Sequence, residues 1–292
     1  MRKQTFLLLS FVLIFNLPLL SYAEQPVISS YVEEEPVIDG FEEEELWGVA
    51  PPVVTNDPIA DISLTLKTLH TKEKIFFLVS FPDHDESRTH KSWTWDNGRK
   101  IYTVGHDIED IFVFKWNLTK GISDLSIYSD TSSRSDVWFW KACRTDPVGF
   151  ADDKMHILSH ARIEDARELT SKSGTTSYLM RKEDSGRRAY RTNMPVEYKA
   201  DTLPRFINQK PSGSRADVTA KGNWRKGVWT IEFSRSLLTG NKDDVQFSTK
   251  AEYLFGVSRY EIAGRAKNQK LSQPLYGTGD VGERLTLRFK SN

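Results

Sequence analysis

The chain has 292 residues, with 40 Lys and Arg, 40 Asp and Glu, six His and a single Cys. A net charge of zero argues against nucleic-acid binding, which depends on an excess of basic side chains. One cysteine excludes an intrachain disulfide and any metal site built only from thiolates. Aromatic residues make up 12% of the chain and include eight Trp. That content suits either a β-rich core or a flat, apolar ligand.

Residues 1–23 have the pattern of a signal peptide. Arg2 and Lys3 precede an apolar run from Phe6 to Leu20, and Ser21-Tyr22-Ala23 places small residues at both ends of a cleavage motif. The apolar run is shorter than the roughly 20 residues of a membrane span, and Arg2-Lys3 is not a twin-arginine pair. We therefore expect Sec-type export, cleavage after Ala23, a periplasmic or secreted location and no stable membrane insertion of the mature chain.

Beyond residue 24 the apolar side chains recur with a period of two. Residues 61–69 alternate between polar and apolar, and residues 74–81 form an apolar run after a polar turn, so the two segments predict a hairpin. Five further segments have strand character: 110–116, 136–140, 227–233, 253–257 and 284–289. Strands separated by turns favour an all-β fold. We predict an antiparallel β-sandwich with long loop insertions and a few short helices.

The expected domain plan is simple. We predict an N-terminal extension over residues 24–36 and a single sandwich domain over residues 37–292. Residues 159–222 are rich in Arg, Lys, Asp, Ser and Gly, which predicts a polar insertion that packs onto the sandwich through its few aromatic residues. The Arg- and Glu-rich segment 161–170 is the best candidate for a short helix.

The sequence contains no Gly-x-Ser-x-Gly elbow, no His-Glu-x-x-His and no Gly-rich phosphate loop. Cys143 has no His nearby in the sequence and follows an aromatic strand, which predicts a buried structural thiol. An enzyme acting alone is therefore unsupported by the sequence.

Two aromatic segments also hold potential ligands. The first, residues 81–95, carries His90, Trp93 and Trp95 where a strand opens into a loop. An imidazole beside aromatic walls can ligate haem iron or bond a propionate. The alternative is a hydrophilic hairpin connection whose two Trp rings fill the core.

The second segment spans residues 136–156. Trp138 and Trp140 point to the same side of a predicted strand, Arg144 follows, and Met155 and His156 offer soft and borderline metal ligands. The alternative is core packing, with the Asp152-Asp153 pair capping a turn.

In order and spacing, these blocks are similar to a known family. The chain resembles the haem-binding domain shared by the γ subunit of ethylbenzene dehydrogenase and related periplasmic proteins. That group, also described as cytochrome c-552/DMSO reductase-like haem-binding domains, lies in the DOMON-like and family 9 carbohydrate-binding-module-like β-sandwich superfamily. The matching blocks are residues 37–40, 46–47, 90–96, 104–110, 114–116, 136–142, 147–153, 217–237 and 239–244.

The resemblance implies non-covalently bound haem b, which γ subunits of the family hold with a Met and a Lys. The Lys falls in residues 264–272, which makes Lys270 the best candidate and Lys267 the reserve. The Met position holds Val137 in this chain. Another donor with a lone pair is then required, and His90 is favoured.

Other residues would complete such a site. Met155 and His156 are the next candidate ligands after His90. Trp93, Trp95, Trp138 and Phe139 would form part of the wall of the haem site, and Arg144 would pair with a propionate.

The resemblance also implies periplasmic electron transfer with a redox partner protein, such as a molybdenum and iron–sulfur oxidoreductase or a cytochrome. The alternative is a carbohydrate-binding or ligand-free sandwich module of the same superfamily.

Overall fold

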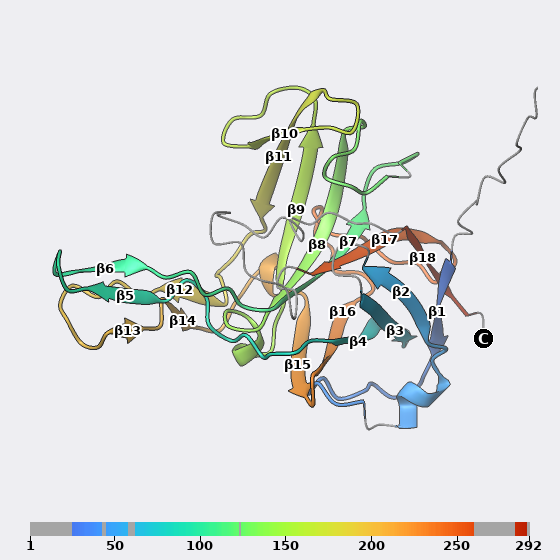
Figure 1. The fold of residues 1–292 in the computed structure, drawn as a ribbon. Coiled ribbons are helices and arrows are strands. Elements are labelled where there is room, and N and C mark those ends of the chain that lie inside the picture. The colour runs from blue at the N-terminus through green and yellow to red at the C-terminus, as the bar shows by residue number, and fades with distance from the viewer. Residues whose placement is uncertain (1–24, 43–44, 58–61, 123, 260–283, 291–292) are drawn as a thin grey trace, which may run out of the picture.

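The computed structural model describes residues 25–42, 45–57, 62–122, 124–259 and 284–290. Over these residues the chain is a β-sandwich of two layers with extensions on two sides (Figure 1). Its fold class is therefore the predicted all-β sandwich, built largely from antiparallel strands.

The first sheet holds eight strands. In spatial order they are β10 (Arg167–Thr170), β11 (Thr176–Glu183), β9 (Asp152–Ser159), β8 (Ser133–Lys141), β7 (Ile111–Asn117), β17 (Tyr253–Arg259), β18 (Leu285–Phe289) and β1 (Gln25–Tyr31).

The second sheet shares β1 with the first. From β1 it continues through β3 (Ile62–His70), β4 (Lys74–Pro82), β16 (Val228–Ser236) and β15 (Thr219–Arg225), while β2 (Val53–Asp57) pairs with β3. β1 runs parallel to both neighbours: residues 25–29 pair with β18, and residues 30–31 pair with β3. The strand therefore joins the two layers at one corner.

The remaining elements are short. A lateral arm contains two small sheets, β13 (Thr202–Leu203) with β5 (Trp93–Asp96) and β6 (Ile101–Val104), and β12 (Tyr190–Thr192) with β14 (Phe206–Asn208) (Figure 1). Three 3₁₀ helices are η1 (Glu45–Val49), η2 (Asp146–Val148) and η3 (Ser214–Ala216). Strands β8, β9, β10 and β11 extend above the sandwich in the same view.

The space between the layers is filled mainly by aromatic rings. The ring centres of Phe77 on β4 and Phe114 on β7 lie 4.8 Å apart, and those of Trp140 on β8 and Trp229 on β16 lie 5.0 Å apart. Five of the eight Trp are fully buried: Trp47, Trp116, Trp138, Trp140 and Trp229. Much of the unusual aromatic content is therefore core, where large rings bury the most apolar area per residue.

All seven strands predicted from the alternation are present, as β3, β4, β7, β8, β16, β17 and β18, and the β3–β4 hairpin is antiparallel as expected. The extension predicted over residues 24–36 contains β1, whose Val27 is fully buried in the core. The short helix predicted over residues 161–170 is wrong. Residues 167–170 form β10, because Leu169 turns inward to pack against Leu179 and Ile127.

One close contact between the layers gives a stability prediction. A Cβ added at Gly222 on β15 would lie 2.5 Å from Cζ2 of Trp140, whereas one added at the exposed Gly48 would meet nothing within 4 Å. Gly222→Ala should therefore reduce the free energy of unfolding by about 1–3 kcal/mol, because the fully buried indole must shift. Gly48→Ala should change it by less than about 0.5 kcal/mol. Urea titrations of both variants test this, and equal stabilities would contradict the close packing.

Candidate functional site

The first sheet is buried on both of its faces at β7 and β8. Phe112, Phe114, Trp138 and Trp140 belong to the core between the layers. The residues that alternate with them form a separate apolar cluster on the opposite face, consisting of Ile111, Val113, Val137 and Phe139. We call this set the outer cluster. These side chains are themselves buried, and they form an apolar cluster outside the sandwich core that includes Val137.

His156 on β9 lies on the same face as the outer cluster. Val137 pairs with Lys154, and Ser135 pairs with His156, so the imidazole lies one diagonal step from Val137. The His156 side chain is 2% exposed, and neither ring nitrogen has a hydrogen-bond partner among the described residues. Buried polar groups without partners are rare and costly. The ring therefore needs an explanation.

The environment of His156 keeps it neutral. Burial holds the pKa of the imidazole well below its ordinary value, and the charges of Lys115, Arg181 and Lys154 lower it further. A neutral imidazole offers a lone pair, which is what haem iron and other borderline metals bind. The same three cations create a positive surrounding that suits a ligand with carboxylate groups.

Met155, the adjacent candidate, lies on the other face of β9. It pairs with Asp136 on the core side, and its Sδ lies 3.1 Å from Nη2 of Arg134. Consecutive residues of a strand point to opposite faces. Met155 and His156 therefore cannot bind the same ion, and only His156 shares the face of Val137.

A buried ion-pair network borders the outer cluster. The Lys141 Nζ donates to Asp152 Oδ2 at 2.5 Å, and Arg215 donates to Asp152 Oδ1 at 2.9 Å and to Glu183 at 2.9 Å. Burial by itself would raise the pKa of Asp152, but Lys141, Lys154 and Arg215 outweigh it and hold that pKa well below its usual range. The network thus keeps several charges ionised inside the protein.

Arg144 is held by Glu109 at the base of the lateral arm. The fully buried Glu109 carboxylate accepts hydrogen bonds from the Cys143 and Arg144 backbone N–H groups, at 2.7 and 3.0 Å, and from Arg144 Nε. The guanidinium also lies over the rings of Tyr190 and Phe206. The charge of Arg144 is therefore already paired within the protein.

His90 lies in the same region as Arg144. Its Nδ1 accepts a hydrogen bond from the Glu109 backbone N–H at 3.4 Å, and burial, followed by the charge of Arg144, lowers its pKa to about 2. Its partner Glu109 lies two residues before Ile111, which pairs with Lys141, whereas His156 pairs with Ser135 at the other end of β8. Six residues of strand span about 20 Å. His90 and His156 are therefore attached far apart along the sheet and are not placed to bind one iron together.

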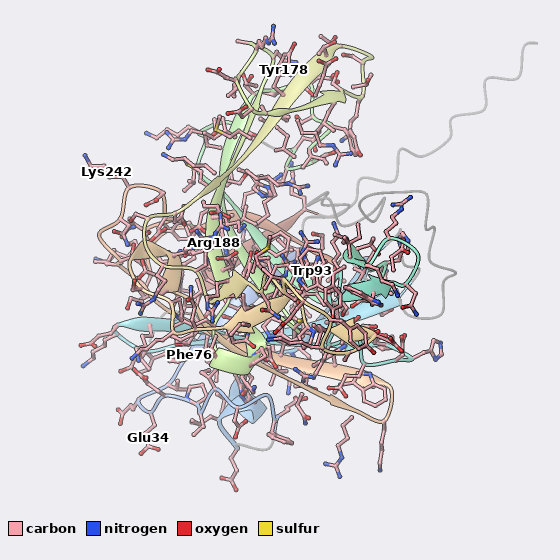
Figure 2. The ribbon with its side chains drawn as sticks, turned by 90° about the vertical axis from the view of Figure 1, so that its left-hand side faces the viewer. Glu34, Phe76, Trp93, Tyr178, Arg188 and Lys242 are labelled. Carbon is pink, nitrogen blue, oxygen red and sulfur yellow. The ribbon has the colours of Figure 1, made fainter. Side chains whose placement is uncertain are left out.

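The candidate wall residues are spread over two regions. Trp138 is fully buried in the core, 5.1 Å from Trp116, so its ring cannot line the outer cluster. Trp93 and Trp95 lie on β5 in the arm, which faces the viewer in Figure 2. Trp93 donates its Nε1–H to the Asn193 carbonyl at 2.7 Å.

The remaining candidates from the sequence are the two lysines, Cys143 and the Asp152-Asp153 pair. Lys270 and its reserve Lys267 lie outside the described residues, and their roles stay predictions. Burial and the Glu109 carboxylate raise the pKa of the Cys143 thiol to about 12, so the thiol stays protonated and unreactive. Asp152 and Asp153 cap no turn. They begin β9 and point to opposite faces.

Of the expected wall residues, Phe139 does belong to the outer cluster. Sequence reasoning missed Val113, Lys115 and Lys141 as part of this face. The signal was present in the apolar runs of β7 and β8, since a strand that is buried on both faces loses the alternation. Lys115 and Lys141 directly follow these runs, yet both are 2% exposed.

The ion-pair network makes a stability prediction. Asp152→Asn should reduce the free energy of unfolding by about 3–5 kcal/mol, because it leaves buried Lys141 without its carboxylate. Adding Lys141→Met should restore part of the loss. Glu252→Gln, which breaks an exposed pair with Arg288, should cost less than about 1 kcal/mol. Urea unfolding at neutral pH measures all three, and an unchanged Asp152→Asn variant would contradict the network.

The neutral state of His156 makes a pH prediction. Its folded pKa lies below its unfolded value, so protons bind the unfolded chain first and stability falls as the pH drops below about 6.5. Between pH 7 and pH 5 the wild-type protein should lose stability that His156→Gln retains. Identical pH slopes in the two proteins would show that the pKa of His156 is the same in the folded and unfolded states.

Solved structures and one family model are similar to this chain. Two similar solved structures are of a carbohydrate binding module family 9 from Caldicellulosiruptor kristjanssonii. The glucose complex has a TM-score of 0.38 and 10% identity, covering 91% of this chain and 96% of that one. The cellotriose complex has a TM-score of 0.37 and 10% identity, covering 92% and 96%. A comparison with curated proteins found no match. The family model described as ethylbenzene dehydrogenase matches residues 48–270, well over half of the sequence, and the chain therefore belongs to the ethylbenzene dehydrogenase family.

Proposed function

We propose that this protein binds haem b non-covalently against the outer cluster, with His156 as an axial ligand, and that it transfers electrons in the periplasm. The observation that carries the proposal is the buried, neutral and unpartnered imidazole of His156 beside Val137. Family membership supplies the expectation of haem b, and Val137 stands where the family pattern has a ligand Met.

The surrounding residues have the chemistry that a haem requires. Val113, Val137 and Phe139 would offer apolar contact to a macrocycle, and their burial would keep water from the metal. Lys115 and Arg181 would supply positive charge for propionates. When bound, the iron would provide one-electron redox chemistry that no side chain of this face can supply. On the family pattern, Lys270 would be the other iron ligand.

The signal-peptide pattern of residues 1–23 supports a periplasmic or secreted location. Among the described residues, no helix is long and apolar enough to cross a membrane. A lone haem domain exchanges electrons with another redox protein. A molybdenum and iron–sulfur oxidoreductase, as in complexes of this family, or a cytochrome is the partner we propose.

The carbohydrate-binding alternative has less support from the arm. Sugar faces stack on exposed, flat aromatic surfaces. The rings of Tyr102 and Tyr198 meet Trp95 edge-on, at 66° and 61°, so the three form no common plane. The guanidinium of Arg205 lies 4.9 Å from the ring centre of Trp93 and covers one of its faces.

Haem titration of the purified mature protein tests the proposal. The apoprotein should take up one haem per chain and develop a Soret band that shifts on reduction. His156→Ala should weaken haem binding by about tenfold or more and change the spin state, whereas His156→Met should keep a ligand and shift the spectrum.

Two matched controls separate the outcomes. His84→Ala removes an exposed imidazole, and Met155→Leu changes the neighbour on the opposite face; both should leave the spectrum unchanged. A wild-type protein that stays colourless after reconstitution would contradict the function. Normal binding by His156→Ala, with circular dichroism showing an intact fold, would contradict the ligand assignment alone.

A further inference from the structure

Three buried carboxylates lie together on the core side of the first sheet. They belong to Asp136 on β8, Asp153 on β9 and Asp244 in the connection between β16 and β17. One carboxylate oxygen from each lies within 4.8 Å of the other two, and the three residues are 0, 0 and 5% exposed. We call them the acid cluster.

Each member of the acid cluster binds the protein through one oxygen. The Oδ2 of Asp136 accepts hydrogen bonds from Arg235 Nη1 at 2.6 Å and from the Val245 backbone N–H at 2.9 Å. The Oδ1 of Asp153 accepts from the Lys154 backbone N–H at 3.0 Å, and Oδ2 of Asp244 accepts from Thr239 Oγ1 at 2.5 Å.

The second oxygen of each carboxylate is left over. Asp136 Oδ1, Asp153 Oδ2 and Asp244 Oδ1 are all buried without a hydrogen-bond donor from the described part of the chain. Each of the three carboxylates is therefore held by the protein through one oxygen, and the lone pairs of its other oxygen are available to a ligand.

A fourth buried carboxylate lies outside the acid cluster. Asp184, which follows β11, is 5% exposed, and neither of its oxygens accepts a hydrogen bond from a described residue. Burial, followed by the charges of Asp243, Asp136 and Asp244, raises the pKa of Asp184 to about 8.

The acid cluster has little compensating charge. Arg235 is the cation that bonds to the acid cluster among the residues described, and it faces three buried carboxyl groups. Removing an unpaired carboxylate from water costs several kcal/mol. One guanidinium cannot compensate three of them, and its donors are already directed at Asp136 and the Val245 carbonyl.

We propose that Asp136, Asp153 and Asp244 bind one Ca²⁺ ion. The donor set consists only of oxygen, which hard cations prefer, and Ca²⁺ takes six to eight such ligands at about 2.3–2.6 Å. Two oxygens on one Ca²⁺ are then at most about 5 Å apart, which agrees with the 4.8 Å limit within the acid cluster. The second oxygens of bidentate carboxylates and water would complete the coordination.

The ion would join two separate parts of the chain. These are the β8–β9 hairpin and the β16–β17 connection, on which Lys242 is labelled in Figure 2. A Ca²⁺ ion would therefore fasten a long connection to the sandwich. This site does not depend on haem, because it lies on the opposite face of the sheet from His156.

Calcium binding to the full mature protein tests the proposal. Protein treated with a calcium chelator should bind one Ca²⁺ per chain by calorimetry, and saturating Ca²⁺ should raise Tm by about 5 °C or more. Asp153→Asn and Asp244→Asn keep the side-chain shape and should each weaken Ca²⁺ binding by about tenfold or more. Asp165→Asn, at an exposed position with φ of 57° that Asn tolerates, should bind like the wild type.

Three results would overturn the proposal. The first is no heat and no change in Tm for the wild-type protein at Ca²⁺ concentrations of about 10 mM, above the range of weak extracellular sites. The second is equal affinity in the Asp153, Asp244 and Asp165 variants. The third is a response to Mg²⁺ with none to Ca²⁺. If Asp153→Asn fails to fold, Asp244→Asn at the less enclosed position carries the comparison.

Discussion

The β8–β9 hairpin is buried on both faces, and the rest of the molecule is arranged around that constraint. One face supplies Trp138 and Trp140 to the core between the layers, and the other supplies Val137 and Phe139 to the outer cluster. A strand buried on both sides must pair or neutralise every polar side chain it carries. The ion pairs of Asp152 meet this requirement. The His156 ring and the acid cluster are exceptions, because they contain polar atoms without a hydrogen-bond partner among the described residues.

The two faces carry opposite charge because neighbouring residues point in opposite directions. Asp152 faces the outer side and pairs with Lys141 and Arg215, while Asp153 faces the core side and joins Asp136 and Asp244. The outer face is thus positive beside an apolar surface, and the inner face is negative beside an arginine. An anionic, flat cofactor suits the first environment and a divalent cation suits the second. One hairpin can serve both, since each face has its own ligands.

Strand positions were predictable from the sequence because alternation and apolar runs report burial directly. The resemblance correctly identified the family, which the match over residues 48–270 confirms. Which face of the sheet each side chain occupies was harder to predict. Met155 and His156 are adjacent in the sequence, and only the pairing register of β8 and β9 shows which of them shares the face of Val137. The anchoring of Arg144 by Glu109 and the meeting of Asp136 with Asp244 depend on contacts between residues 35 and about 100 positions apart. Local patterns contain no information on such contacts.

The central claim is that the His156 imidazole binds haem iron beside Val137. Low-temperature EPR of the ferric, haem-loaded protein tests it most directly when histidine is labelled with ¹⁵N. We expect a low-spin signal whose nitrogen couplings change on labelling in the wild-type protein but not in His156→Met, where the unlabelled haem nitrogens alone contribute. A wild-type signal that is insensitive to the label, or a label-dependent change that persists in His156→Met, would contradict the account.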